Sequence, residues 1–542
     1  MLNHAACANG HTDYGARSPL LRGVKLKPDI AMKTLAEISA FGATDADNDQ
    51  ILFQAFEDHE AHEAVKARER FLIVGRKGSG KTAIFKRLVN TKRPDYFCFG
   101  HTFSDYPWHH HDLQARIGIP DFDKYTHSWK YLILLTLAKV VLNQDQALPY
   151  DDSSMDSMAR IERFVTDTYG SRDPDVTQVF TPTKQLRLRP HFEFDAKLLK
   201  AGISPESVPM TELPTIVQDV NRNLTERCLD CLHPDHEYFI CFDQLDLGFD
   251  PQRPEYNNRL IGLILASRDL NLAARDRGKK FFIAVFLRTD IYESLHFEDK
   301  NKITENFLSS IEWDTPRTTK TLQQLMEKRF TTLLQSAPEE RVPWHDVFDE
   351  AAQMPGRQSK YQHMLDRTFL RPRDMIRFCN SVLKQYKLRL ADQANQGSAK
   401  FANIDTNKAR PEYGDYLLAE LDDEIFKHLP DYRLYLEILK EIGVWQFSRD
   451  QFEQAFASPK FEGRLPAFPA KILESLFAFS LVGFYSAGGR GYGGSEYVFR
   501  HKDPSQAFDT TATRFRIHPG YIEVLGLKRF TIGEKDADGQ DG

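Results

Sequence analysis

The fold of this chain is decided by residues 71–82, which read Phe-Leu-Ile-Val-Gly-Arg-Lys-Gly-Ser-Gly-Lys-Thr. The first four residues form an apolar run that ends in glycine, which is typical of a buried parallel strand. Residues 82–89 then carry apolar side chains at helical spacing. The order of strand, glycine-rich loop and helix predicts the P-loop type of α/β fold.

Each residue type in this loop suits a polyphosphate ligand. Glycines without a Cβ let backbone N–H groups approach phosphate oxygens, and the start of the helix adds its positive dipole end. Lys81 supplies a positive charge for the β and γ phosphates, and Thr82 offers a hydroxyl to Mg²⁺. A glycine-rich turn that binds nothing is the alternative, and the full match in its context disfavours it. We therefore expect ATP and Mg²⁺ as ligands, with nucleotide contacts from Gly75, Arg76, Lys77, Gly78, Ser79, Gly80, Lys81, Thr82 and Ala83.

The composition is that of a globular intracellular protein. The chain has 542 residues, 41% of them hydrophobic, with a net charge of −6. This length predicts several domains, and six cysteines are too few for a disulfide framework. The most apolar helical run, residues 131–142, is too short to span a bilayer. We expect a cytoplasmic protein without a secretory signal and without membrane association.

Further strand and helix signals extend the P-loop prediction along the chain. Apolar runs at residues 238–242 and 281–287 alternate with helical segments, which indicates a parallel, doubly wound sheet with helices on both faces. After residue 316 helical signals dominate, and three helices followed by a hairpin near the C-terminus outline a winged helix. The expected organisation is an N-terminal arm (1–29), a P-loop core (30–315, with an insertion at about 145–205), a helical lid (316–425), a winged-helix domain (426–530) and an acidic disordered tail (531–542).

Acidic and amide side chains follow the second apolar strand. Asp243 closes that strand and is expected to join Thr82 in holding Mg²⁺. Many ATPases of this division place a glutamate next, but Gln244 stands here and cannot accept a proton. Either Asp246 acts as the base or Gln244 orients the attacking water. In both cases slow hydrolysis is expected.

Three arginines are candidates for sensing the γ-phosphate. Arg288, followed by Thr289, ends the third strand, where a polar side chain can face the nucleotide, although an ordinary surface arginine fits that place equally well. Arg371 and Arg373 flank Pro372 at a predicted helix start, from which a lid arginine can reach the phosphates. Pairing of Arg373 with a nearby aspartate is the alternative.

Two histidine-containing clusters suggest metal binding only weakly. Residues 228–236 contain Cys228, Cys231, His233 and His236, but the ligands are so close together that little chain remains to wrap a tetrahedral zinc ion. The run of histidines at residues 109–111 has no accompanying cysteines. The preferred interpretation is helix packing for the first cluster and a surface loop for the second.

The order of these motifs resembles that of the additional-strand ATPases, and within them the AAA-like and STAND-like NTPases, including the origin-recognition type. The sequence is most similar to bacterial P-loop ATPases related to the KAP group. The resemblance is carried by residues 41–47 (FGATDAD), 71–82, 241–246 (CFDQLD), 286–290 (FLRTD) and 370–374 (LRPRD). It implies a nucleotide-driven switch, and it implies a setting in bacterial antiphage defence or mobile-element biology.

The leading hypothesis is a regulatory ATPase whose C-terminal domain reports the nucleotide state, with a homo-oligomer and a partner effector protein as expected assemblies. One alternative is an ATP-gated DNA-binding protein, because basic residues outnumber acidic ones in residues 485–529 and Arg490 lies at the expected wing tip. Another is a nucleotide-binding scaffold without useful hydrolysis. Arg317 and Arg329 are the candidates for an arginine finger offered to a second subunit.

Overall fold

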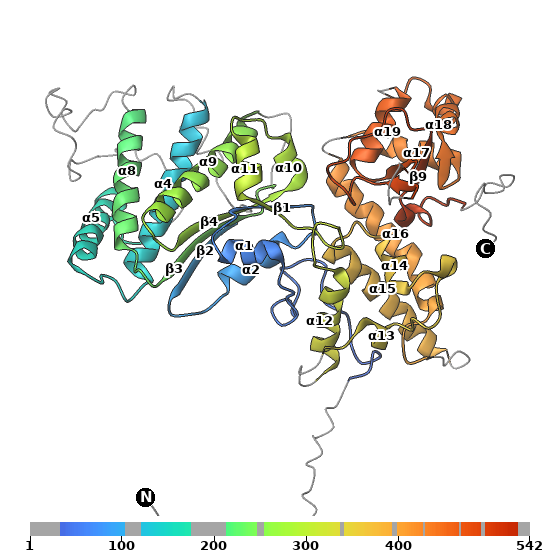
Figure 1. Ribbon diagram of the computed structural model, residues 1–542, viewed down its shortest axis with the longest axis horizontal. Coiled ribbons are helices and arrows are strands. Elements are labelled where there is room, and N and C mark those ends of the chain that lie inside the picture. The colour runs from blue at the N-terminus through green and yellow to red at the C-terminus, as the bar shows by residue number, and fades with distance from the viewer. Residues whose placement is uncertain are drawn as a thin grey trace, which may run out of the picture.

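The computed structural model describes residues 33–102, 121–174, 213–246, 254–335, 341–392, 398–426, 429–465, 468–488 and 494–528. The sheet of the P-loop region occupies one half of the molecule (Figure 1). The C-terminal region and the lid helices occupy the other half, with the lid helices below the C-terminal region in this view. The predicted arm and tail lie outside the described residues, as do the histidine run at 109–111 and Arg490.

Within the described residues, five strands form the P-loop sheet in the order β2-β3-β4-β1-β5, and every neighbouring pair is parallel. This confirms the predicted fold class. β4 lies between the P-loop strand β1 and the acid-ended strand β3. The strands are β1 (Leu72–Gly75), β2 (Tyr96–Thr102), β3 (Glu237–Asp243), β4 (Phe281–Arg288) and β5 (Leu308–Ser310).

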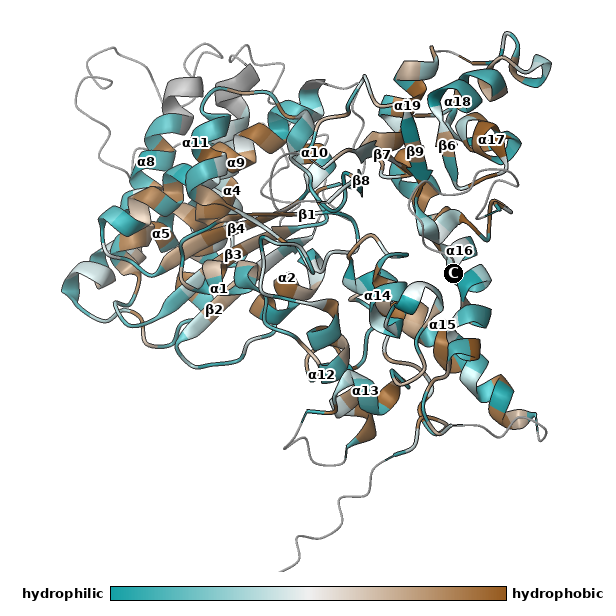
Figure 2. Ribbon diagram, turned by 45° about the vertical axis from the view of Figure 1, so that its right-hand side comes forward, coloured by the Kyte–Doolittle hydropathy of each residue, from teal (hydrophilic) through white to brown (hydrophobic). Residues whose placement is uncertain are grey.

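The central strands are buried on both faces because helices cover both faces. β1 and β4 are apolar along almost their whole length, and Figure 2 shows them as the most hydrophobic part of the sheet. Helices α1 and α2 lie on one face, while α4 and α9 pack against each other on the opposite face (Figure 1). The helices of this region are α1 (Glu60–Lys66), α2 (Lys81–Val89), α4 (Asp121–Asn143), α5 (Asp152–Tyr169), α8 (Leu213–Cys231), α9 (Pro254–Asp276), α10 (Thr289–Ser294) and α11 (Lys300–Phe307).

The lid is helical, as its sequence predicts. α15 and α16 pack along each other, and α12 packs against α15. Arg371 precedes α15, and Pro372 occupies the first turn of this helix, where its missing N–H is harmless. The lid elements are α12 (Leu322–Leu334), α13 (Trp344–Val347), a 3₁₀ turn at Pro355–Arg357, α14 (Lys360–Leu365), α15 (Pro372–Ala391) and α16 (Asn403–Ile425).

The described residues of the C-terminal region form a winged helix, with three α-helices and an antiparallel sheet in the order β6-β9-β7-β8. The predicted hairpin corresponds to β7 and β8, while β6 and β9 were not predicted. The elements are α17 (Tyr432–Ile442), β6 (Gln446–Ser448), α18 (Arg449–Phe456), a 3₁₀ turn at Pro459–Phe461, α19 (Pro469–Ala478), β7 (Val482–Ser486), β8 (Glu496–Val498), β9 (Arg514–Ile517) and a 3₁₀ turn at Pro519–Tyr521.

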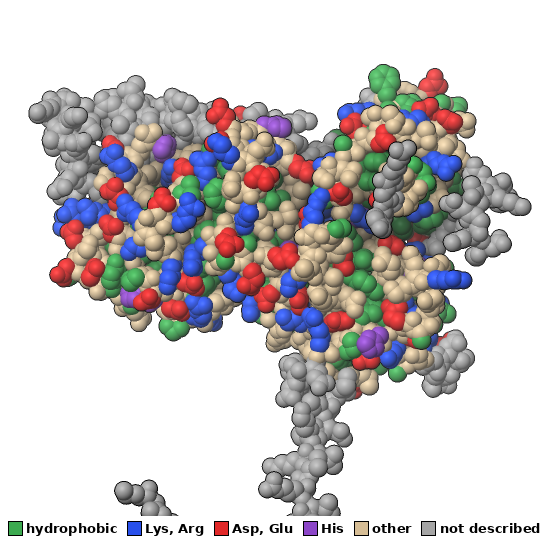
Figure 3. Space-filling view, viewed as in Figure 1, with side chains coloured by type: hydrophobic (Ala, Val, Ile, Leu, Met, Phe, Trp, Pro, Cys, Tyr) green, Lys and Arg blue, Asp and Glu red, His purple; other side chains and the backbone are tan. Residues whose placement is uncertain are grey.

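The surface carries charges of both signs. Figure 3 shows acidic and basic side chains intermingled over the visible face of both halves. Among the described helices, none is both long enough and apolar enough to cross a membrane.

Candidate nucleotide-binding site

The glycine-rich loop joins the end of β1 to the start of α2. Gly78 and Gly80 have φ angles of +80° and +109°, which residues with a Cβ rarely adopt. A Cβ on Gly78 would also lie only 3.0 Å from Cβ of Arg373. The loop therefore owes its tight curl to glycine, and the curl brings the lid close to the loop.

Lys81 is the first residue of α2 and folds back over the loop. Its Nζ donates hydrogen bonds to the carbonyl oxygens of Gly75 at 2.8 Å and Arg76 at 3.0 Å. Burial lowers the pKa of Lys81 to about 8, and the nearby Asp243 and Asp246 act in the opposite direction. An anion bound at the loop would favour the protonated ammonium further.

Asp243 ends β3 at the same edge of the sheet as the P-loop. Its side chain is almost completely buried, and its Oδ2 accepts no hydrogen bond from any described residue. Burial raises the pKa of Asp243, while hydrogen bonding to Thr82 opposes that rise. A buried carboxylate oxygen without a partner, beside a threonine hydroxyl, is a donor set that fits Mg²⁺.

The turn after Asp243 places Gln244 and Asp246 differently. Gln244 has a φ of +59°, an unusual value for a residue with a side chain. Its backbone N–H bonds to Asp243, and its side-chain amide makes no hydrogen bond to the described residues. Asp246 instead accepts a hydrogen bond from Arg288 at 3.3 Å. Arg288 also makes a two-point contact with Asp290, at 3.0 and 2.7 Å. The structure thus brings Arg288 to the site, held between two aspartates.

The two lid arginines both contact the P-loop region. Arg371 is buried and donates to both carboxylate oxygens of Asp374 at 2.9 Å and to the carbonyl oxygen of Lys77 at 3.1 Å. Arg373 donates to the carbonyl oxygen of Thr44 at 3.1 Å. The alternative pairing of Arg373 with Asp374 or Asp366 is wrong, because its carboxylate partner is Glu420, at 2.8 Å.

An apolar cleft that was not predicted lies on the Ser79–Gly80 side of the loop. Its wall includes Trp313, whose Nε1 donates to the carbonyl oxygen of Ser79 at 3.0 Å, and His59, whose Nε2 bonds to the carbonyl oxygen of Glu312 at 2.8 Å. Other lining residues come from the segment before α1, from α2 and from the start of α15: Leu52, Phe56, Ala83, Ile84 and Pro372. These residues are far apart in sequence, so only the fold shows that they meet.

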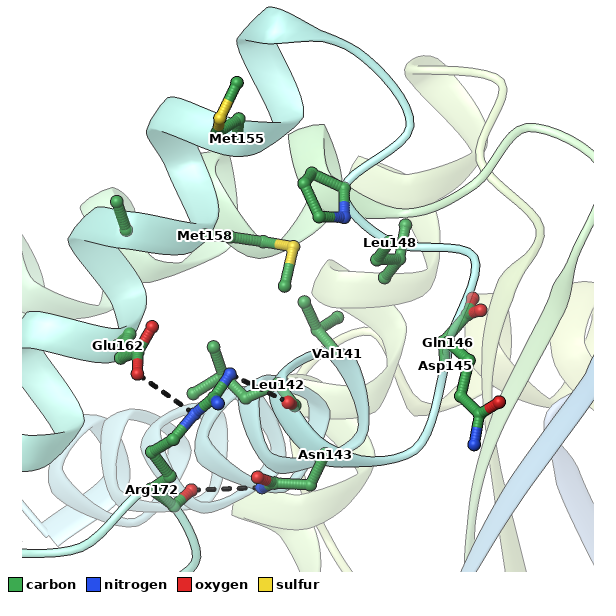
Figure 4. A pocket seen from close by; sticks show the side chains of 12 residues that line it. Val141, Leu142, Asn143, Asp145, Gln146, Leu148, Met155, Met158, Glu162 and Arg172 are labelled. Carbon is green, nitrogen blue, oxygen red and sulfur yellow. Dashed lines mark hydrogen bonds and ion pairs between the residues drawn. The ribbon is translucent and has the colours of Figure 1, made fainter.

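A second hollow lies between α4 and α5, away from the P-loop (Figure 4). Met158 and Leu148 face it, and Arg172 reaches across to Glu162 at 3.1 Å. It contains none of the predicted site residues.

The structure bears on two further predictions, for the cysteine cluster and for Arg329. Cys228 and Cys231 are buried in helix packing, with their sulfur atoms near the carbonyl oxygens of Leu134 and Ser154, so the packing interpretation of this cluster holds. Arg329 is wrong as an arginine finger, because it is buried and paired with Asp49 at 2.6 Å within its own chain.

Comparison with known proteins shows similarity to a family model, to a curated protein and to a solved structure. Residues 320–422 match the FunZ-associated C-terminal helical domain. This match covers the lid from α12 to most of α16. The chain is also 23% identical over 543 residues to a putative transposon gamma-delta 80.3 kDa protein of Escherichia coli strain K12, covering 94% of this chain and 70% of that protein. The solved structure of the Aeropyrum pernix Orc1 protein in complex with DNA aligns with a TM-score of 0.32 and 13% identity, covering 86% of this chain and 89% of that one.

Proposed function

We propose that this chain binds Mg²⁺ and ATP at its P-loop and hydrolyses ATP slowly, as a conformational switch. The observation that carries the proposal is the meeting of Lys81, Thr82 and buried Asp243 at one edge of the sheet, where Oδ2 of Asp243 has no hydrogen-bond partner among the described residues. The Gly75–Ala83 loop would hold the phosphates. The proposal keeps the domain boundaries expected from the sequence.

The roles at the phosphate end follow from position. Lys81 neutralises phosphate charge, and Thr82 and Asp243 would hold Mg²⁺, which supplies charge neutralisation and orients the phosphates when it is bound. Arg288 stands at the neighbouring strand end, where it can sense the γ-phosphate. Its two aspartate partners keep the guanidinium in place.

Water activation is assigned to Gln244 as an orienting residue. Asp246 is already engaged by Arg288, whereas the side-chain amide of Gln244 makes no hydrogen bond to the described residues. An orienting amide removes no proton, which fits slow turnover.

Steady-state ATP turnover of two variants tests this assignment. We expect Gln244→Ala to reduce the rate about a hundredfold, since misplacing a reactant by about 1 Å has that effect. Asp246→Asn should reduce it much less. A collapse with Asp246→Asn alone would make Asp246 the base, and near-normal turnover in both variants would contradict both assignments.

DNA binding is a second candidate function, favoured by arginines on the winged-helix sheet. The guanidinium of Arg516 lies 3.8 Å from the ring centre of Tyr497 and 4.6 Å from that of Trp445, and Arg514 lies 5.8 Å from Tyr485. Neither arginine forms an ion pair with a carboxylate of the described residues. Arginines interleaved with aromatic rings suit a nucleic-acid backbone and its bases, and the similarity to a protein named for a transposon agrees with this proposal.

Binding of duplex and single-stranded DNA at low salt, with and without ATP, tests this candidate. Binding should weaken steeply as salt rises, because phosphate contacts release counterions. Arg514→Glu should weaken it, whereas Arg163→Glu, an equal charge reversal on exposed α5 at the far end of the molecule, should leave it unchanged. Equal effects of the two variants, or undetectable binding at low salt, would rule out this surface.

A further inference from the structure

Three carboxylates near the end of α16 reach the basic residues of the P-loop and the lid. We call Glu420, Asp423 and Glu424 the α16 carboxylate cluster. Lys77 of the loop contacts Asp423 at 2.9 Å and Glu420 at 3.5 Å. Both carboxylates therefore lie beside a cation that the sequence assigns to nucleotide contact.

Glu424 is the most buried member of the cluster. It forms an ion pair with Arg371 and lies 3.6 Å from Arg76. Its side chain is only 12% exposed, and that of Arg371 is 2% exposed. Burial alone would raise the pKa of Glu424, but Arg371, Arg76 and Arg288 outweigh it and hold the pKa below its ordinary value. The cluster thus places a buried negative charge among the cations of the phosphate site.

A phosphate group seeks the same cations as these carboxylates. Glu420 and Glu424 are one helical turn apart and Asp423 lies between them, so a single face of α16 presents all three charges to the loop. Like charges in a partly buried site repel, so nucleotide phosphates and the cluster compete for Arg76, Lys77 and Arg371.

We propose that the α16 carboxylate cluster is a latch that holds the P-loop cations while nucleotide is absent and is displaced when ATP binds. This inference rests on the proposed nucleotide binding at the loop. Its consequence is a coupling between the site and the C-terminal region, because whatever weakens the latch must strengthen ATP binding by the same factor.

The contacts around Phe369 show where the displacement would be felt. Arg76 and Arg371 lie over the ring of Phe369, at 4.9 and 5.1 Å from its centre. The same ring stacks on His518 of the winged-helix region at 4.5 Å. If Arg76 and Arg371 left Glu424, their contact with the Phe369 ring would change, and that ring also contacts the winged helix. In addition, α16 itself packs against the 3₁₀ turn at Pro519–Tyr521.

Calorimetric titration of the full chain with Mg·ATP tests the latch. Glu424→Gln should bind ATP about tenfold more tightly than wild type, within the usual range of coupling between sites. Asp423→Asn, whose side chain is 67% exposed and contributes little to the core, should bind about threefold more tightly. Asp415→Asn is the matched control, because Asp415 is exposed on the same helix and forms no ion pair with the described residues.

Each outcome decides between the latch and the nucleotide site. If the wild type binds ATP but Glu424→Gln and Asp423→Asn bind it with unchanged or weaker affinity, the latch is overturned and the proposed function stands. If Glu424→Gln fails to fold, Asp423→Asn decides alone. Absence of ATP binding in wild type and in every variant overturns both proposals. Faster amide exchange in α16 of the wild type on adding ATP would support the latch, and unchanged exchange there would contradict it.

Discussion

Replacing Lys81 with alanine is expected to abolish tight ATP binding. The loop then loses the ammonium that lies over it and that a phosphate would pair with. A ligand present at a hundred times its Kd stabilises the folded state by about 2.7 kcal/mol, and Lys81→Ala should lose this stabilisation entirely. Thermal unfolding with and without Mg·ATP measures the loss.

Lys86→Ala provides the matched control for this variant. Lys86 lies on the same helix α2, but it forms an ion pair at 2.6 Å with Asp47, which belongs to the segment before α1. The Lys86→Ala substitution removes the same charge without changing the loop, so ATP should stabilise this variant as it does the wild type. Wild-type ATP affinity in Lys81→Ala would show that the loop is not the nucleotide site.

Replacing Asp243 with asparagine should remove hydrolysis while leaving nucleotide binding largely intact. The loop still holds the phosphates, but the buried carboxylate that fits Mg²⁺ is lost. Metal-assisted charge stabilisation contributes several kcal/mol to such reactions, so the turnover rate should fall about a thousandfold. Single-turnover hydrolysis, measured beside ATP affinity, separates the two effects.

The stability of Asp243→Asn without ligands gives an independent check. Burial raises the pKa of Asp243, so the folded state holds this proton to a higher pH than the unfolded state does. Stability is therefore lost as the pH rises through that raised pKa, and the ionised carboxylate weakens the fold at neutral pH. Asp243→Asn should unfold at the same or a higher temperature than wild type at pH 7 when Mg²⁺ and nucleotide are absent. A clearly lower temperature would mean that Asp243 supports the fold instead.

Most of the P-loop region could be predicted because its signals are local. β1, β3 and β4 are short apolar runs that end in glycine, aspartate and arginine, and the pattern of each lies within ten residues. β5 was missed because its residues, Leu308–Ser310, have no apolar run, and only pairing with β1 makes them a strand.

Long-range partners explain what the sequence did not show. Arg329 has the sequence surroundings of a surface residue, yet it is buried because it pairs with Asp49, which is 280 positions away. The α16 carboxylate cluster has no signal except acids one turn apart, which are common on solvated helices. Its meeting with Arg76 and Lys77 follows only from the way the lid folds back over the loop.

Self-association, a partner effector and a setting in defence or mobile-element biology stay predictions. Arg317 is the remaining arginine-finger candidate, and it is now paired with Asp503 of the winged-helix region. A second subunit would have to compete with that contact.

The most direct test of the central claim is equilibrium titration of the full chain with Mg·ATP, followed by a chase of the bound nucleotide. The account predicts one ATP bound per chain, with loss of binding in Lys81→Ala and conversion to ADP far slower than the binding step. Absence of saturable ATP binding at any concentration up to the millimolar range would contradict it.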